Sequence, residues 1–416
     1  MTKRTKRRSI AAAIAVTALG CISIPLAAPG ARLVPGSADG NPAWLAGLYG
    51  DGFALSPTTY LLLLYVAVAL WIAVVPLARQ LGRRVITAIG AALLVLFALA
   101  PPLLSLDVFS YISYARLGVE HGLNPYDYGP SAIPADAAAS RVEDFRDAVS
   151  VYGPLFTLGS YPLGALGVPA ALWSLKAIAA LSIAGIAALS ARLAVLRGVE
   201  PIGAAAFVAL NPLVLVHLVG GAHNDSLMML IAMLAITAAL TRRPLAAGVG
   251  IAAAVAVKAS GALYAPFLLV GSSERRRFLL GLVGSALLIG LAGLALFGDS
   301  FISAFTVAGD NQDTVSRWSV PGTLSRITGA DVDALRLLFG IGYVALVVGL
   351  LVWVARGADW VRAAGWAALG LLVASAYMAP WYLIWLLPIA AVSRDRALVA
   401  ASVAFTLFQV RNGVPV

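Results

Sequence analysis

Residues 85–104 read VITAIGAALLVLFALAPPLL, and SLDVFSYISYARLGVEHGLNPYDYGP follows them as far as residue 130. The first part is an apolar run of about 20 residues, the length at which a helix spans the hydrocarbon core of a bilayer. Asp107 comes directly behind this run. A carboxylate at such a place is costly to keep there and usually has a function.

Similar apolar runs recur along the whole chain. Of its 416 residues, 61% are hydrophobic and 12% are charged, compared with about 25% charged residues in soluble domains. The composition therefore predicts an all-α, polytopic membrane protein, organised as one integral-membrane domain over residues 1–416. We expect about thirteen transmembrane helices, at residues 10–28, 57–77, 85–104, 170–191, 201–219, 227–240, 244–257, 261–272, 278–297, 336–356, 362–378, 381–392 and 397–412.

Three of the apolar segments are too short to span comfortably. Residues 244–257 and 261–272 are best interpreted as a hairpin that enters the membrane and returns, and residues 155–168 as a re-entrant or interfacial segment. Broken elements of this kind are tolerated where they line a cavity.

The basic residues predict the orientation, because short loops rich in Lys and Arg stay in the cytoplasm. One topology, with a cytoplasmic N-terminus, places roughly 19 of the 29 basic residues inside. The net charge of +10 is then mainly an orientation signal. Because these charges are scattered over short loops, they do not form a nucleic-acid surface.

The opposite side of the predicted membrane collects three polar segments, at residues 105–153, 220–226 and 298–335. They hold most of the acidic residues and two of the three His, His121 and His223. The reaction chamber should therefore open away from the cytoplasm, where cytoplasmic nucleotide donors do not reach it. The single Cys21 forms no internal disulfide, so packing must hold these loops.

The N-terminus has an alternative interpretation. Its basic tail, apolar run and small residues resemble a secretory signal, and ALGC ending at Cys21 resembles a lipoprotein box. The run is nearly of spanning length and lacks the usual leucine three residues before the cysteine, which favours an uncleaved helix.

The first polar segment contains the strongest candidate for a catalytic residue, Asp107. At the membrane surface, partial desolvation would raise the pKa of Asp107 and make it a competent general base. A structural alternative is a polar helix cap followed by interfacial tyrosines. In GLNPYDYGP, Asn124 and Tyr126 offer hydrogen bonds or a stacking face to a sugar.

The second candidate is GGAHNDSLMM, which places His223, Asn224 and Asp225 in a tight turn between two apolar helices. The structural alternative is capping of the next helix by Asn224 or Asp225. The functional interpretation has His223 donating to an anionic oxygen while Asp225 orients it or binds a hydroxyl. A metal site here lacks a specified third ligand.

Two further cations and one loop complete the candidates. Lys258, in VAVKASGALY, needs a phosphate or carboxylate partner if it is buried, and the alternative is snorkelling toward the interface; for Lys176 we expect snorkelling. In GDNQDTVSRWSVPGTL, Arg317 could bind a phosphate and Trp318 could stack on a sugar, beside Asp310, Asn311 and Asp313. For YGPLFTLG and MAPWYLIWLLP the interfacial interpretation outweighs the functional one.

Taken together, six segments carry a resemblance that runs from about residue 55 to 412. They are DVFSYISYARLGVEHGLNPY, VYGPLFTLG, NPLVLVHLVGGAHNDSLMM, VAVKASGALYAPFL, DTVSRWSVPGTL and MAPWYLIWLLP. In this order they resemble the actinobacterial polyprenol-phosphate-mannose-dependent α-(1→6)-mannosyltransferases. These enzymes have the GT-C fold, with catalytic extracytoplasmic loops, and assemble lipomannan and lipoarabinomannan.

The resemblance implies an inverting transfer of mannose from a polyprenyl-phosphate-mannose donor to a glycolipid or mannan hydroxyl, in a bacterial plasma membrane and on its extracytoplasmic side. It implies that Asp107 is the general base. We assign the donor phosphate to His223, Lys258 and Arg317, because the leaving phosphate needs cationic help. We assign sugar and acceptor binding to Tyr111, Arg116, Asn124, Tyr126, Asn224, Asp225 and Trp318.

No cofactor is expected to be required, since Lys and Arg can neutralise a leaving phosphate, although assistance by a divalent ion stays open. Two alternatives also stay open. One is a GT-C transferase of another lipid-phosphate sugar. The other is a flippase or transporter of lipid-linked sugars, which would concentrate its polar groups at the middle of the membrane.

Overall fold

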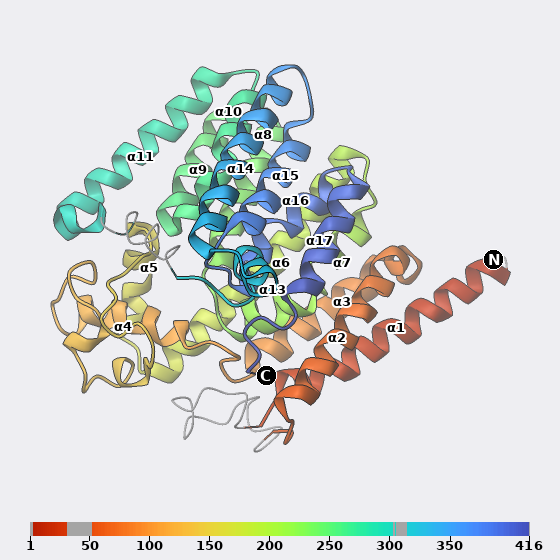
Figure 1. Ribbon diagram of the computed structural model, residues 1–416, viewed down its shortest axis with the longest axis horizontal. Coiled ribbons are helices and arrows are strands. Elements are labelled where there is room, and N and C mark those ends of the chain that lie inside the picture. Colours follow the sequence, from red (N-terminus) through yellow and green to blue (C-terminus); the bar gives the residue numbers. More distant parts are fainter. Residues whose placement is uncertain (1–2, 31–51, 303, 305–313, 416) are drawn as a thin grey trace.

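The computed structural model describes residues 3–30, 52–302, 304 and 314–415. All regular elements in these ranges are helices (Figure 1). The longest are α1 (Lys3–Ala27), α2 (Pro57–Val74), α3 (Ala78–Leu99), α6 (Val168–Arg197), α11 (Arg275–Phe297) and α14 (Val332–Ala355). Shorter apolar helices are α7 (Pro201–Ala209), α8 (Asp225–Leu240), α9 (Pro244–Val257), α10 (Ala265–Gly271), α15 (Trp360–Ala374), α16 (Leu387–Val392) and α17 (Arg396–Gln409).

The remaining elements are short or lie in the polar segments. They are α4 (Asp107–Val119), α5 (Pro154–Gly164), α13 (Val320–Thr328) and the tighter or wider turns η3 (Val75–Leu77), η4 (Pro130–Ala132), η5 (Ala139–Arg141), η6 (Val214–Gly220), η7 (Ala259–Tyr264), η8 (Gly298–Ile302) and η10 (Pro380–Trp385).

The predicted helices are mostly present, but thirteen spans are not confirmed. Among the described residues, five continuous helical stretches are long and apolar enough to cross a membrane, and α7 with η6 makes a sixth if this pair, bent by 60°, counts as one span. One stretch, Pro57–Leu99, has 43 residues, which at 1.5 Å per residue is about twice the bilayer thickness. Gly82, near the start of α3, breaks this stretch with a φ of +79°, so residues 57–81 and 83–99 form two limbs.

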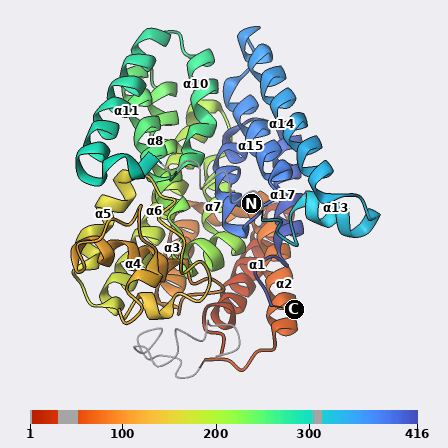
Figure 2. The ribbon, with the colours of Figure 1, turned by 60° about the vertical axis from the view of Figure 1, so that its left-hand side comes forward.

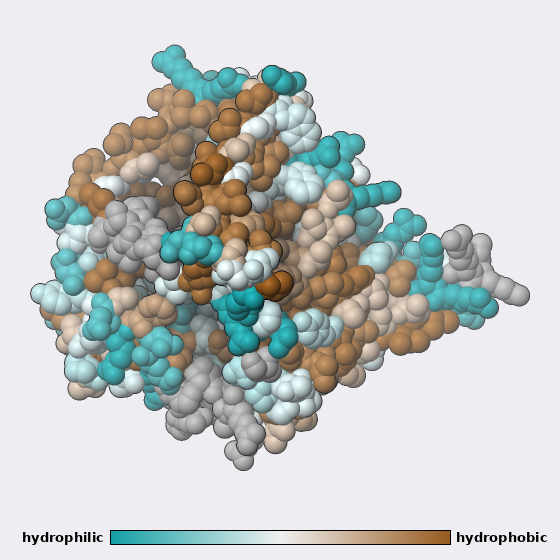
Figure 3. Space-filling model, in the orientation of Figure 1, coloured by the Kyte–Doolittle hydropathy of each residue, from teal (hydrophilic) through white to brown (hydrophobic). Residues whose placement is uncertain are grey.

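The arrangement separates the basic turns from a polar lobe, which consists of α4, α5 and residues 120–153 between them. Helix α9 packs between α8 and α11, α6 packs against α7 and α8, and α1 lies along α2 and α3. Figures 1 and 2 show α4 and α5 together on one side, away from the turns that join α8 to α9 and α14 to α15. In Figure 3 a broad hydrophobic band lies between hydrophilic groups at the top and upper right and others at the lower left. This pattern indicates a multi-pass membrane protein.

Candidate active site

The segment between α3 and α4 places Asp107 beside the end of η6. Pro101 and Pro102 follow α3 and cannot continue it, because proline lacks the amide proton that a helix needs. The amide of Leu103 donates to the carbonyl of Gly220 at 3.2 Å, which joins this segment to the end of η6. Asp107 is then the first residue of α4, and its amide donates to the Ser105 hydroxyl at 3.2 Å.

The turn between η6 and α8 places His223 against Asp107. His223 Nδ1 lies 3.5 Å from Asp107 Oδ2 and 3.4 Å from the Tyr111 hydroxyl. The imidazole is fully buried and stacks on the Trp381 ring, with 3.6 Å between ring centroids. A side chain on Gly221 would collide with the His217 carbonyl and the His223 ring, so the turn requires glycine there.

Asp225 and Lys258 form a buried ion pair beside this contact. Lys258 Nζ lies 2.6 Å from Asp225 Oδ2, and the indole of Trp385 donates to Asp225 Oδ1 at 2.9 Å. The Asp225 side chain has no exposed surface, whereas that of Lys258 is 17% exposed. An ammonium group has three protons, so Lys258 keeps donors for a further anion.

Aromatic rings enclose both pairs. Tyr111 makes edge contacts with Tyr152 and Phe156, at centroid distances of 5.0 and 5.4 Å. On the other side Tyr382 stacks on Trp385 at 4.2 Å, and the Lys258 ammonium lies 5.1 Å from the Tyr382 ring centre. Rings of this kind keep the site low in polarity and offer faces on which a sugar can stack.

The surroundings change the proton affinities of the two groups in contact. The Asp107 side chain is 39% exposed, and partial burial of its carboxyl raises its pKa to about 6. The positive charge of Lys258 opposes the rise, and the charge of Asp225 adds to it. Burial, followed by the charge of Lys258, holds the pKa of His223 well below its usual range. A neutral histidine therefore faces a carboxyl group that ionises near neutral pH, which suits acid–base chemistry.

A small apolar groove ends at the same place. It has a volume of about 90 Å³ and lies between α5, α6 and the start of α8, with Leu155, Ile178 and Leu227 on its apolar walls. His223 and Asn224 form its polar end. His223 Nε2 and both amide atoms of Asn224 are buried and have no hydrogen-bond partner among the described residues. Buried polar atoms without partners are costly and are typical of a place that receives a ligand.

Three of the predicted sugar-binding residues make hydrogen bonds within or next to the polar lobe. Arg116 Nε donates to Asp136 at 2.8 Å, and Asp136 also lies 3.1 Å from His121 Nε2. Asn124 donates to the carbonyl of Phe297 at 2.9 Å. The Tyr126 hydroxyl lies 2.8 Å from the Tyr152 carbonyl oxygen. None of these contacts reaches Asp107, His223, Asp225 or Lys258.

In the third polar segment, the described residues 314–335 make no hydrogen bond or ion pair with the four central residues. Arg317 is exposed, and its guanidinium lies 5.7 Å from the Trp318 ring centre; Arg326 and Arg411 face the same ring, at 5.1 and 4.8 Å. The carbonyl of Trp318 accepts from Gln409 on α17 at 3.0 Å. Asp310, Asn311 and Asp313 lie outside the described residues.

The interfacial interpretation of MAPWYLIWLLP is wrong for its two tryptophans. Trp385 is only 6% exposed and bonds Asp225, and Trp381 stacks on His223. The signal in the sequence was the density of aromatic residues beside two prolines, which does not distinguish a membrane interface from a site wall. For a metal, the described residues contain no group of three or more His, Cys, Asp or Glu arranged to hold one.

Lys176 is not at the interface, where snorkelling would place it. It is fully buried in α6, and its ammonium donates to the carbonyls of Gly220 at 2.6 Å, Pro101 at 3.3 Å and Val219 at 3.4 Å. Pro101 leads to Asp107 and Gly220 leads to His223. Lys176 therefore acts as a clamp that fixes the two segments whose ends meet in the site.

We expect Lys176→Met to lower kcat about 10- to 100-fold, because a small displacement of the reacting groups raises the activation free energy. Lys176→Gln, which keeps a donor, should recover part of the loss. Ala177→Met, at an exposed neighbouring position, is the matched control. The measurement is kcat and both KM values with each variant; if kcat of Lys176→Met stays within twofold of wild type, the clamp is not needed.

Comparison with known proteins identifies relatives of the whole arrangement. The family model described as alpha-(1→6)-mannopyranosyltransferase, N-terminal domain, matches residues 13–273, and the model of glycosyltransferase family 87 matches residues 151–410. Alpha-(1→6)-mannopyranosyltransferase A of Mycobacterium tuberculosis is 29% identical over 358 residues, which cover 77% of this chain and 69% of the relative.

A second relative matches a smaller part. Alpha-(1→6)-mannopyranosyltransferase A of Corynebacterium glutamicum is 32% identical over 181 residues, covering 42% of this chain and 36% of the relative. The chain thus spans about a third of that relative and about two thirds of the mycobacterial one. Since the first family model covers more than half of the sequence, the chain belongs to the alpha-(1→6)-mannopyranosyltransferase family.

Proposed function

We propose that this protein transfers mannose from a polyprenyl-phosphate-mannose donor to a hydroxyl of a mannan or lipoglycan acceptor, forming an α-(1→6) linkage with inversion. The observation that carries the proposal is the contact between Asp107 and His223 beside the Asp225–Lys258 pair, at the polar end of an apolar groove. The family membership supports the sugar and the linkage.

In the proposed reaction Asp107 is the general base. The acceptor oxygen attacks the anomeric carbon of mannose, the bond from that carbon to the phosphate oxygen breaks, and Asp107 takes the hydroxyl proton. The polyprenyl phosphate leaves with the electron pair. A carboxylate with a pKa near 6 is ionised at neutral pH and still has enough basicity to accept the proton.

The leaving phosphate needs positive charge and hydrogen-bond donors. Lys258 supplies charge from the Asp225 side. At the groove end, His223 Nε2 and the Asn224 amide have no hydrogen-bond partner in the part of the chain that the structure describes. We assign donor phosphate binding to His223 and Lys258, with Arg317 approaching from the third polar segment. Tyr111, Asp225, Asn224 and Trp318 then border the sugar and acceptor positions. The apolar groove would take the first part of the prenyl chain.

Catalysis in this scheme uses side-chain charge, and we propose that no cofactor is required. We infer a GT-C architecture in a bacterial plasma membrane, with the N-terminus cytoplasmic and the site extracytoplasmic. Arginines lie in or next to the turns that join α8 to α9, α10 to α11 and α14 to α15, which lie away from α4 in Figure 1, and their position supports this orientation.

The assay that tests the function uses purified protein, radiolabelled polyprenyl-phosphate mannose and a short α-(1→6)-mannoside, with and without a chelator. We expect chelator-resistant formation of an α-(1→6)-linked product. Transfer from another lipid-phosphate sugar, but not from mannose, would replace the substrate and keep the mechanism. No transfer with any donor, together with movement of lipid-linked sugar across vesicle membranes, would favour a flippase.

The proposed base predicts the acid limb of the pH profile. Asp107 has a raised pKa of about 6 and accepts a proton only when ionised, so kcat/KM should rise as the pH increases through about 6 and level off above it. The measurement is kcat/KM at saturating acceptor from about pH 5 to pH 8. A profile that is flat across this range would contradict the role of Asp107.

A further inference from the structure

A second, larger groove lies at the other end of the molecule from Asp107. It has a volume of about 490 Å³ and runs between α3, α6 and α7. Arg83 stands near the start of α3 and Arg192 near the end of α6. Lys176, which borders the active site, precedes Arg192 by 16 residues on the same helix, a separation of about 24 Å. The groove is therefore distinct from the catalytic site.

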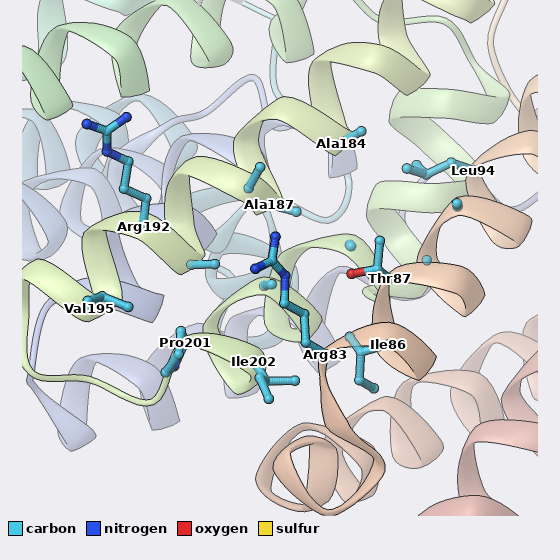
Figure 4. Close-up of a pocket in the computed structure, with 16 residues that line it drawn as sticks. Arg83, Ile86, Thr87, Leu94, Ala184, Ala187, Arg192, Val195, Pro201 and Ile202 are labelled. Carbon is cyan, nitrogen blue, oxygen red and sulfur yellow. The ribbon is translucent and has the colours of Figure 1, made fainter.

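Small side chains make the wall of this groove. Seven alanines and Gly90 line it, together with a few larger apolar residues such as Ile86 and Leu94. Ala184 and Ala188 are exposed along α6, which faces α3 across the groove in Figure 4. The wall offers dispersion contacts along its length and few polar groups, which suits a hydrocarbon chain.

The groove also carries two arginines without a protein partner. Within the described part of the chain, neither Arg83 nor Arg192 has a hydrogen bond or ion pair, and both are exposed. Figure 4 shows Arg83 extending from α3 toward α6, with Thr87 one turn further along α3. By contrast Arg197, also on α6, binds the carboxylate of Asp359. The two exposed guanidinium groups beside the apolar wall are suited to an anion that carries an apolar chain.

We propose that this groove binds one anionic phospholipid, with an acyl chain along the alanine wall and the phosphate between Arg83 and Arg192. The Thr87 hydroxyl can donate to the same phosphate. A soluble phosphate would leave the apolar wall uncovered. A zwitterionic lipid would bring a positive choline group close to the two arginines, whereas an anionic lipid brings only its negative phosphate. Basic pockets between membrane helices are known to select acidic headgroups. This inference does not depend on the proposed transfer reaction.

The experiment is native mass spectrometry of the detergent-purified, full-length chain titrated with dioleoyl phosphatidylglycerol or dioleoyl phosphatidylcholine. Wild type should retain phosphatidylglycerol about 10-fold more strongly, since each arginine near an acidic headgroup contributes measurably. Arg83→Gln combined with Arg192→Gln should abolish this preference. Arg276→Gln combined with Arg356→Gln removes the same charge at exposed positions outside the groove and should keep it.

A second variant separates the wall from the charges. Ala188→Phe fills the groove from an exposed position and leaves both arginines in place, so it should also reduce retention of phosphatidylglycerol. Equal retention of the two lipids by wild type would overturn the proposal. Three other results would also overturn it. They are loss of the lipid preference in the Arg276/Arg356 control, unchanged phosphatidylglycerol binding by Ala188→Phe, and a dimer of this chain that the Arg83/Arg192 variant disrupts.

Discussion

Replacing Asp107 with Asn should abolish transfer while the protein stays folded and still binds donor lipid. The amide keeps the shape of the carboxyl group but does not accept the acceptor proton, and loss of a general base costs about 10²- to 10⁴-fold in rate. The nearest contact, to His223 Nδ1 at 3.5 Å, can persist with the amide oxygen as partner. The measurement is single-turnover transfer from radiolabelled polyprenyl-phosphate mannose, alongside donor binding at equilibrium.

The matched control for this variant is Asp144→Asn. Asp144 is an exposed acid in the same polar segment, so its replacement removes an equal charge without touching the site. Its turnover should equal that of wild type. Near-normal turnover by Asp107→Asn would refute the assignment of the base, and loss of donor binding in that variant would indicate a structural role.

Lys258→Met should have the second-largest effect, because it leaves Asp225 buried and unpaired. Removing one partner of a buried ion pair costs about 3–5 kcal/mol of stability, and here it also removes the cation closest to the proposed phosphate. We expect a large rise in the KM for the donor. We also expect a lower midpoint of unfolding, measured by tryptophan fluorescence. Acceptor KM should change little. Since the charge of Lys258 lowers the pKa of Asp107, the acid limb of the pH profile should move to higher pH.

A double variant separates the two consequences of losing Lys258. The double variant Lys258→Met with Asp225→Asn has no unpaired buried charge. Its midpoint of unfolding should therefore lie closer to that of wild type than the midpoint of Lys258→Met does, while donor binding stays weak. Lys258→Arg, which keeps the charge, should keep more activity than either. Equal losses of donor and acceptor affinity in Lys258→Met would mean that the site as a whole had collapsed.

Several site residues were predictable because local sequence makes them anomalous. Asp107 behind an apolar run, the polar turn from His223 to Asp225, and Lys258 between short apolar helices each need a partner in a low-polarity setting. The expectation that a buried Lys258 needs a carboxylate or phosphate is met by Asp225. The snorkelling expected for Lys176 was wrong, because this side chain is buried and its partners are three backbone carbonyls.

Arg116, Asn124 and Tyr126 show the limit of inference from residue type. Their side chains are suited to sugars, yet their contacts are with Asp136, Phe297 and Tyr152, within or next to the polar lobe. Conversely, Trp381 and Trp385 resemble interfacial anchors in sequence and line the site in the structure. A hydrogen-bonding or aromatic side chain serves a ligand and a loop equally well, so only its neighbours distinguish the two.

By itself the sequence determined the helical segments, their apolar character and the clustering of basic residues in short loops, since these depend on composition over a few turns. The tertiary structure alone decided which polar groups meet. Asp225 pairs with Lys258 across 33 residues and with Trp385 across 160, and Tyr111 reaches His223 across 112. Such pairings follow from how helices pack and where proline and glycine break them, and the breaks at Pro101 and Gly221 turn separate polar residues into one site.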